Sequence, residues 1–124
     1  MRAVKGKNTK PELVLRRMLH RLGYRYRLHV QELPGKPDIV FSRKKCVIFV
    51  HGCFWHQHRC AAAVRPESRR EYWDAKLDGN ARRDKRNRRL LRSLGWSSMI
   101  VWECQLKRPL AVEQRLINFL NKQS

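Results

Sequence analysis

The sequence has 124 residues, which is enough for a single domain over residues 1–124 and too few for two. Lys and Arg number 29 against 10 Asp and Glu, so the formal net charge is +19, while hydrophobic residues make up 42%. This composition argues against a disordered chain, and no run of about 18 apolar residues points to a membrane span. It favours nucleic acid as the partner, and without a secretory signal we expect a cytoplasmic, nucleoid-associated protein.

The first predicted elements are a helix, a strand and a turn. Thr9 and Glu12 fit a capping box, and apolar residues then recur at helical spacing as far as Leu22. Residues 24–30 alternate in strand fashion, and a turn rich in Pro and Gly follows at 34–37.

Two short apolar runs, 38–41 and 46–50, flank a basic turn and are predicted to pair as antiparallel strands, the second largely buried. From about Pro66 to Leu94 the composition favours helix, with a break expected at Gly79. The side chains of this segment expected to face inward are Tyr72, Trp73, Leu77, Leu90, Leu91 and Leu94.

The same helical segment carries six Arg or Lys between positions 82 and 89, which predicts an exposed basic face. A buried strand over 98–102 and a closing helix over 109–120 complete the pattern. The order α-β-β-β-α-β-α implies an α/β fold with a mixed sheet flanked by helices.

Three potential metal ligands, Cys53, His58 and Cys60, lie close together in the sequence, and Cys104 follows a separate strand. Zinc in structural sites favours four tetrahedral N and S ligands, and three cysteines with one histidine are a standard set. The alternative is buried thiols beside a surface histidine. Cys46 opens an apolar run and is predicted to be a free, buried cysteine.

Asp38 is the candidate catalytic carboxylate, because it stands where a strand emerges from a turn and phosphodiester cleavage needs a carboxylate-held Mg²⁺. His51, at the end of the neighbouring strand, and His56 titrate near neutral pH and suit acid-base roles. Each residue has another interpretation: Asp38 as a turn cap, His51 as a strand-end group, His56 as a zinc ligand and Glu12 as a capping-box member only.

Phe54 and Trp55 lie inside the predicted metal loop, and Trp73 lies on the following helix. Large aromatics beside basic residues suit a wedge that unstacks a base step, which costs less where a mismatch weakens the stack. Ordinary core packing is the alternative.

Several strings together resemble the very-short-patch-repair (Vsr-type) DNA mismatch endonucleases across nearly the whole chain. The most specific of them is HGCFWH at 51–56. The strings are PGKPD at 34–38, CVIFVHGCFWH at 46–56, Asn80 with Arg83-Asp84, GW at 95–96 and VWEC at 101–104.

The resemblance implies a restriction-endonuclease-like fold, a diverged PD-(D/E)XK relative with a structural zinc site. It implies an endonuclease that nicks one strand of double-stranded DNA 5′ of the thymine in a T:G mismatch left by deaminated 5-methylcytosine, initiating very short patch repair. The expected cofactors are catalytic Mg²⁺ and structural Zn²⁺. We expect a monomer, with mismatch-repair proteins as candidate partners.

Carried onto this sequence, the resemblance places Mg²⁺ on Asp38 with the backbone carbonyl of Val50. His51 and His56 take acid-base or water-mediated roles, and Glu12 assists. The remaining implied residues are the zinc ligands Cys53, His58, Cys60 and Cys104, the wedge of Phe54, Trp55 and Trp73 beside the mismatch, and the DNA-binding residues Asn80 and Arg83.

Two departures from the family pattern stand out. The family's N-terminal arm is expected to be absent or truncated here, and Gln57 and Arg59 stand where relatives can carry further histidines. Two alternatives therefore stay beside mismatch nicking. One is a zinc-stabilised DNA-binding module without catalysis, and the other is a nuclease of this fold that ignores mismatches.

Overall fold

One four-stranded sheet, in the order β1-β2-β3-β4, forms the centre of the protein. The structure is a computed structural model that describes residues 9–58, 60 and 63–122. The strands are β1 (Arg27–Leu28), β2 (Ile39–Phe41), β3 (Cys46–His51) and β4 (Ser97–Trp102), and the helices are α1 (Lys10–Arg21), α2 (Arg70–Ser93), the 3-10 helix η2 (Glu103–Lys107) and α3 (Pro109–Lys122).

The sheet is mixed, as the sequence predicts. β1 pairs antiparallel with β2 and β2 with β3, whereas β3 and β4 run parallel from Cys46 opposite Ser97 to His51 opposite Trp102. The parallel pair needs a long crossover, which α2 supplies. The predicted antiparallel pairing of 38–41 with 46–50 and the predicted order of elements are confirmed.

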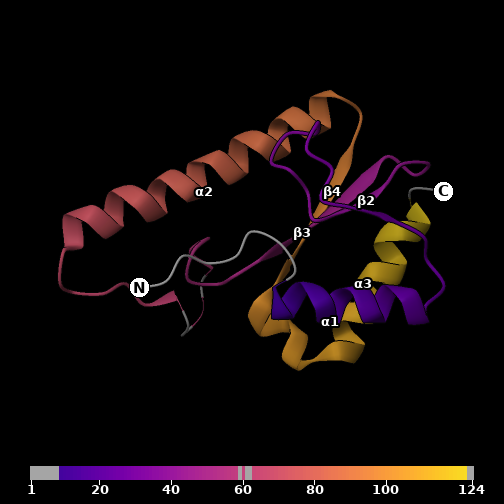
Figure 1. The fold of residues 1–124 in the computed structure, drawn as a ribbon, viewed down its shortest axis with the longest axis horizontal. Helices are drawn as coiled ribbons and strands as arrows, with labels where there is room; N and C mark the ends of the chain where they lie inside the picture. The colour runs from indigo at the N-terminus through magenta and orange to yellow at the C-terminus, as the bar shows by residue number, and fades with distance from the viewer. Residues whose placement is uncertain (1–8, 59, 61–62, 123–124) are drawn as a thin grey trace.

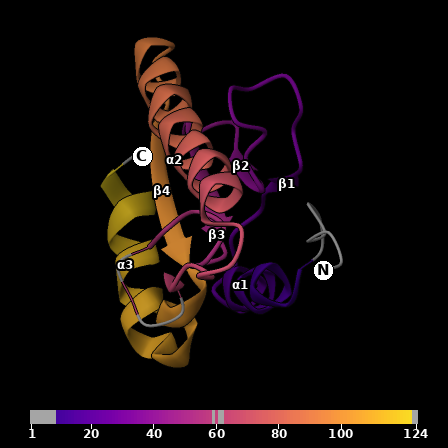
Figure 2. The same cartoon turned by 90° about the vertical axis from the view of Figure 1, so that its left-hand side faces the viewer.

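Helices cover both faces of the sheet: α2 crosses one face, while α1 and α3 lie together on the other (Figure 1, Figure 2). Side chains alternate along β3 accordingly, because successive residues of a strand point to opposite faces. Cys46 and Ile48 pack with α1 and α3, and Val47 and Phe49 pack with Leu91 of α2.

Helix α1 begins as its sequence predicts, because the Thr9 side chain accepts the backbone N–H of Glu12 at 3.4 Å. Leu15 and Leu19 are fully buried one turn apart. In α3, Leu116 and Leu120 are likewise fully buried. Both helices thus present the predicted apolar stripe to the sheet.

The strand predicted over 24–30 is shorter than expected. The ladder contains only Arg27–Leu28, because His29 takes a left-handed backbone conformation with φ of 50° that ends the extended run. Tyr24 and Tyr26 still lie over the sheet, each with its ring edge-on to Phe41 at 6.2 Å.

The prediction of a helix from Pro66 that breaks at Gly79 is wrong. Helix α2 begins at Arg70, after Arg69 in the left-handed conformation, and runs for 24 residues through Gly79. A single glycine costs about 1 kcal/mol against alanine, too little to interrupt a helix that packs on a sheet.

The face of α2 that packs on the sheet is narrower than the sequence suggests. Only Leu77 and Leu91 of the predicted inward residues are buried. Tyr72, Leu90 and Leu94 are 46–58% exposed, so their predicted burial is wrong. A long helix leaning on one face of a small sheet leaves most of its circumference in solvent.

Gly35 brings the turn before β2 against α2. Its φ is +80°, and a Cβ there would lie 3.0 Å from the Phe49 ring and 3.1 Å from the side chain of Asn87. A larger residue would therefore push the turn away and move Asp38 with it.

No helix in the described ranges is both long and apolar enough to cross a bilayer.

Replacing Leu116 by alanine should lower the free energy of unfolding by about 2–5 kcal/mol, because the side chain is fully buried between α3 and the sheet. Leu110→Ala on the same helix is the matched control. Leu110 is 78% exposed, and a change within about 0.5 kcal/mol is expected. Urea unfolding of both variants measures the difference, and equal effects would contradict the assigned packing of α3.

Candidate active site and metal centre

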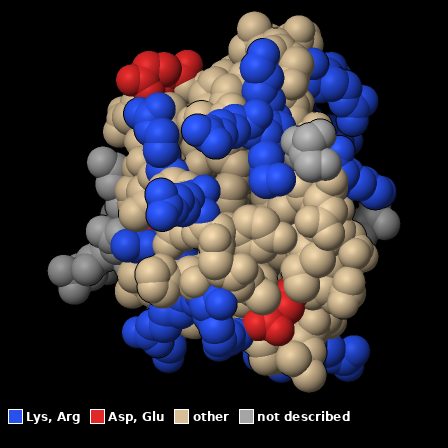
Figure 3. Space-filling model, turned by 90° about the vertical axis from the view of Figure 1, so that its right-hand side faces the viewer, with Lys and Arg blue, Asp and Glu red and all other residues tan. Residues whose placement is uncertain are grey.

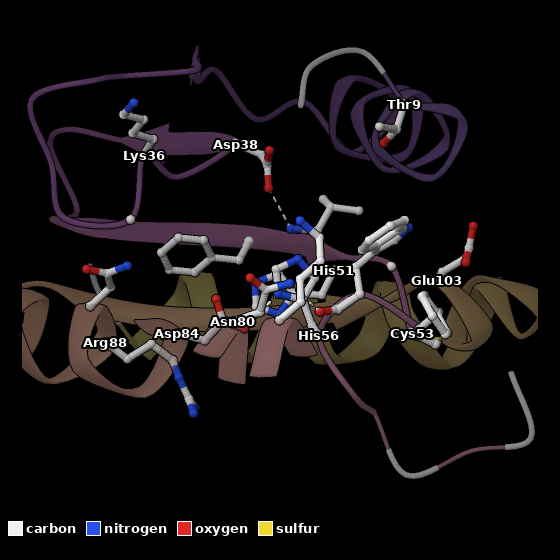
Figure 4. Close-up of a pocket in the computed structure, with 18 residues that line it drawn as sticks. Thr9, Lys36, Asp38, His51, Cys53, His56, Asn80, Asp84, Arg88 and Glu103 are labelled. Carbon is white, nitrogen blue, oxygen red and sulfur yellow. Dashed lines mark hydrogen bonds and ion pairs between the residues drawn. The ribbon is translucent and has the colours of Figure 1, made fainter. Parts of the chain in front are cut away.

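A cleft with a volume of about 720 Å³ opens between the end of β3 and helix α2. Figure 4 shows Asp38 on the side of β2, with Asn80, Asp84 and Arg88 on α2 opposite, and His51 and His56 between them. Residues far apart in the chain thus meet where β3 ends. The cleft brings together the predicted catalytic residues Asp38, His51 and His56.

Asp38 precedes the first residue of β2, and its carboxylate accepts the backbone N–H of Val50 at 2.7 Å. Burial raises the pKa of Asp38 from its ordinary value of 3.8 to about 6, while this hydrogen bond and the nearby His29 oppose the rise and Glu12 adds to it. A carboxylate held in such surroundings gains from a nearby cation.

Glu12 lies beside Asp38 and is only 1% exposed. Its carboxylate contacts His29 Nε2 at 2.8 Å and Arg16 at 3.5 Å, so the negative charge is paired. The backbone N–H of His29 also donates to the carbonyl of Asp38 at 3.0 Å. Glu12 therefore faces the site as well as occupying the first turn of its helix.

His51 and His56 form a parallel stack, with ring centroids 3.7 Å apart and an interplanar angle of 7°. His51 is 5% exposed, and burial together with His56 lowers its pKa to about 3, so this ring is neutral at physiological pH. Its Nδ1 has no hydrogen-bond partner among the described residues. An unpaired buried nitrogen at the edge of a cleft is available to a ligand or water.

The second ring of the stack is oriented by helix α2. His56 Nδ1 lies 2.6 Å from Asp84 Oδ2, and because an ionised carboxylate only accepts, the imidazole donates from Nδ1. This contact fixes the orientation of the His56 ring and turns its Nε2 away from Asp84. The pairing separates His56 from the zinc ligands, so the interpretation of His56 as one of them is not supported.

The four predicted zinc ligands converge. The ligand atoms of Cys53, His58, Cys60 and Cys104 all lie within 4.8 Å of one another, and Cys104 Sγ is 3.4 Å from His58 Nδ1. The His58 ring stacks on Trp102 with centroids 4.2 Å apart, which holds its orientation. Separations of this size suit tetrahedral zinc with bonds of about 2.0–2.3 Å.

Cys46 lies apart from this group, as predicted. It is fully buried in the core and free, and burial raises the pKa of its thiol to about 11. A thiol in such surroundings stays protonated and unreactive.

Three aromatic side chains form a half-buried cluster beside the cleft, which we call the aromatic cluster: Phe54, Trp55 and Trp73. Their centroids lie 5.1–5.9 Å apart. None of them belongs to either core, so ordinary core packing does not account for the cluster. Asn80 donates to the carbonyl of Trp55 at 3.0 Å, and Arg83 in turn donates to Asn80.

Basic side chains extend along α2 away from the aromatic cluster. Arg88 and Lys36 also line the cleft (Figure 4). Lys and Arg also spread over the face in Figure 3, so the positive charge is not confined to one helix. The exposed basic residues of α2 in this region are Arg82, Arg83, Lys85, Arg86, Arg88, Arg89 and Arg92.

Two side chains of the site carry no role in the sequence prediction. His29 is found once β1 and β2 are paired, because the register of Leu28 with Ile39 places it opposite Asp38. Asp84 is the one acidic residue in the basic run 82–89, and this exception is the signal in the sequence that could have identified it.

The first 62 residues match the family model described as DNA mismatch endonuclease Vsr. A type II nicking enzyme, V.XorIIP of Xanthomonas oryzae, is 48% identical over 121 residues, which cover 98% of this chain and 89% of that protein. The chain belongs to the Vsr family of DNA mismatch endonucleases. The predicted enzyme class, a DNA endonuclease, is thereby confirmed.

Other relatives and a solved structure agree with this. The DNA mismatch endonuclease Vsr of Escherichia coli is 43% identical over 107 residues, covering 86% of this chain and 69% of that protein. The catalytic domain of the homing endonuclease I-Bth0305I superposes with a TM-score of 0.66 at 19% identity, covering 94% of this chain and 98% of that domain. The fold of this Vsr-family chain is that of an endonuclease catalytic domain.

Replacing Asp38 by asparagine should raise the free energy of unfolding by about 1–3 kcal/mol at pH 7 without added Mg²⁺, because it removes a charge that burial disfavours. The pKa of Asp38 is raised from 3.8 in the unfolded chain to about 6 in the folded chain. Between about pH 4 and about pH 6 the folded chain therefore binds more protons at Asp38 than the unfolded chain does. The destabilisation is complete above about pH 6 and vanishes below about pH 4.

Urea unfolding of the wild type and the variant at several pH values measures this difference. His51 has a lowered pKa and therefore destabilises the fold as pH falls, but it is present in both proteins and cancels. Asp74→Asn is the control: the pKa of Asp74 is lowered by Arg65, so its loss should not stabilise. A stability difference for Asp38→Asn that grows as pH falls would refute the assignment.

Proposed function

We propose that this Vsr-family chain is a Mg²⁺-dependent endonuclease that nicks one strand of double-stranded DNA 5′ of the thymine in a T:G mismatch. The observation that carries the proposal is that Asp38, the stacked His51 and His56, and Phe54 and Trp55 of the aromatic cluster line a single cleft. The relatives named DNA mismatch endonuclease and type II nicking enzyme support it. T:G mismatches left by deaminated 5-methylcytosine would be the substrate.

The cleft fits Mg²⁺ at Asp38. The pKa of Asp38, raised by burial, favours a compensating cation, and Val50 donates its N–H to the carboxylate. In an extended strand the N–H and carbonyl of one residue point to the same side, so the carbonyl oxygen of Val50 is a suitable second ligand. Bound there, Mg²⁺ would neutralise charge on the scissile phosphate.

Residues of the cleft are proposed to bind the phosphate, orient the attacking water and protonate the leaving group. Lys36 and Arg88 line the cleft and would hold the phosphate by its charge. His51 stays neutral and offers an unpaired nitrogen that can orient the attacking water. His56, whose Nδ1–H donates to Asp84, can hold a proton at Nε2 and release it to the leaving 3′ oxygen.

The metal centre of Cys53, His58, Cys60 and Cys104 is proposed to hold structural Zn²⁺. It ties the loop after β3 to η2, which follows the parallel neighbour β4. The four protein ligands leave no open position for substrate, which is typical of a structural and not a catalytic site.

The aromatic cluster is proposed to read the mismatch. Insertion of an aromatic wedge between two bases costs a few kcal/mol of stacking free energy, and this cost is lower at a mismatched step. Phe54, Trp55 and Trp73 are half-buried, so their rings offer an exposed part to the bases. The basic face of α2 would bind the DNA backbone without regard to sequence.

Wild-type protein with Mg²⁺ should nick a T:G duplex on the thymine strand, and Asp38→Ala should slow nicking by about 10³-fold or more through loss of the cation. His56→Ala should cost about 10²–10⁴-fold, as for a general acid. Gel analysis of an end-labelled duplex gives the rate and the position of the nick. The exposed Glu67→Ala is the control for loss of an acidic group.

The outcomes separate the alternatives. Equal nicking by wild type and Asp38→Ala would refute the catalytic assignment. Equal cleavage of T:G and fully paired duplexes would indicate a general nuclease. Binding with a steep salt dependence but without any nick would indicate a DNA-binding module.

Replacing Cys104 by alanine should lower zinc affinity by more than about 100-fold and lower the melting temperature, because one of four ligands is lost and the loop is released. Cys46→Ala is the matched control, since this cysteine lies in the core away from the centre. Zinc content after dialysis measures the effect. Retention of one zinc per chain by Cys104→Ala would contradict the proposed ligand set.

A further inference from the structure

Two side-chain amides hold the backbone of the aromatic cluster. Gln57 Nε2 donates to the carbonyl of Phe54 at 2.7 Å, and Asn80 Nδ2 donates to the carbonyl of Trp55 at 3.0 Å. Asn80 belongs to α2, so it holds Trp55 directly against the helix. Gln57 lies in the loop itself, so it can hold Phe54 in place only if its own position is set elsewhere.

Gln57 has a backbone conformation that it would not adopt unaided. Its φ is 52°, in the left-handed region, which costs about 1–2 kcal/mol for a residue with a Cβ. Its amide oxygen accepts from Arg65 Nε at 2.7 Å, and its amide nitrogen also reaches the carbonyl of Ala63 at 3.4 Å. The surroundings therefore maintain the turn, and Arg65 makes the shortest contact that comes from outside it.

The guanidinium of Arg65 is anchored on α2. Nη1 donates to Asp74 and Nη2 to Asp78, each at 2.6 Å. The two aspartates lie four residues apart and so share one face of the helix. These carboxylates raise the pKa of Arg65, and Arg65 in turn lowers that of Asp74.

A planar guanidinium makes these three directed hydrogen bonds at once, which the single ammonium of a lysine cannot reproduce. Arg65 therefore connects α2 to Gln57, and Gln57 connects to Phe54. The same helix carries Trp73, the third member of the aromatic cluster.

We propose that Arg65 is a positioning residue for mismatch recognition, which it supports by fixing the loop that carries Phe54 and Trp55 against the helix that carries Trp73. The proposal rests on the proposed reading of the mismatch by the aromatic cluster. A cluster held in place before binding avoids the entropy cost of ordering its side chains on DNA. This lower entropy cost matters only when the rings insert between bases, and they insert more readily at a mismatched step. Preorganisation therefore strengthens binding to the mismatched duplex more than binding to the paired one.

Mismatch selectivity tests this role. Selectivity is the ratio of the dissociation constants for paired and T:G duplexes, measured with the zinc-loaded chain carrying Asp38→Asn to prevent nicking. Arg65→Gln should lower this ratio about tenfold, by weakening T:G binding more than paired binding. The ratio for Arg65→Lys should fall between those of the wild type and Arg65→Gln, because lysine keeps the charge but not the three directed hydrogen bonds.

Arg70→Gln is the matched control. Arg70 also contacts Asp74, at 3.2 Å, but it is 57% exposed, and among the described residues Asp74 is its side chain's one hydrogen-bond partner. Its loss removes the same charge and should leave the ratio within about twofold of the wild type.

Asp78→Asn tests the same connection from the helix side. Asp78 is half exposed, so the variant is expected to fold, and it weakens the anchoring of Arg65 without changing Arg65 or Gln57 themselves. It should also lower the ratio. The added positive charge strengthens binding to both duplexes alike and cancels in the ratio.

Acrylamide quenching of tryptophan fluorescence supplies a readout other than binding. Arg65→Gln should make the aromatic cluster more accessible at unchanged zinc content and melting temperature. Wild-type selectivity in both Arg65→Gln and Asp78→Asn would overturn the proposal. So would an equal loss of selectivity in Arg70→Gln.

Phe54→Ala separates this proposal from the proposed function. If Phe54→Ala leaves selectivity unchanged, the proposed reading of the mismatch by the aromatic cluster fails, and the proposed role of Arg65 fails with it. If Phe54→Ala abolishes selectivity while Arg65→Gln and Asp78→Asn preserve it, only the role of Arg65 fails.

Discussion

The period-two alternation of strand β3 is the constraint on which the site depends. β3 pairs with β2 on one edge and with β4 on the other, so its register cannot shift by one residue without exchanging its two faces. In this register Ile48 faces α1 and α3, and His51 lies with Phe49 towards α2. A one-residue slip would bury the histidine in the wrong core and take its ring away from His56 and Asp84.

The loop after β3 serves three neighbouring centres because its side chains leave in different directions. His56 returns to stack on His51, Cys53 and His58 turn towards Cys104, and the aromatic side chains lie by α2. Each direction has its own anchor in the fold: Asp84 for His56, Trp102 for His58 and Asn80 for Trp55. One short loop can therefore take part in the proposed catalysis, metal binding and recognition without any of these side chains serving two of them.

The sequence predicts those parts of the fold that local chemistry determines. Thr9 caps α1, the apolar runs pair as strands, and the Cys and His residues converge as a metal set. Partners set by tertiary register could not be predicted from local pattern, because they depend on how elements pack. His29 and Asp84 are two such partners. Arg65 is a third, since its partners lie on a helix whose start at Arg70 differs from the predicted Pro66.

The net charge of +19 and the aromatic cluster contribute to different quantities. Counterion release by basic residues strengthens binding to any duplex by the same factor, so it adds affinity and speed but no discrimination. Discrimination requires a term that differs between paired and mismatched DNA, and unstacking by rigid rings is such a term. A chain this basic gains little from further charge, since stronger binding to paired DNA only raises competition for the mismatch. If the aromatic cluster reads the mismatch as proposed, selectivity depends on how rigidly its three rings are held, and the hydrogen bonds to the backbone of Phe54 and Trp55 contribute to that rigidity.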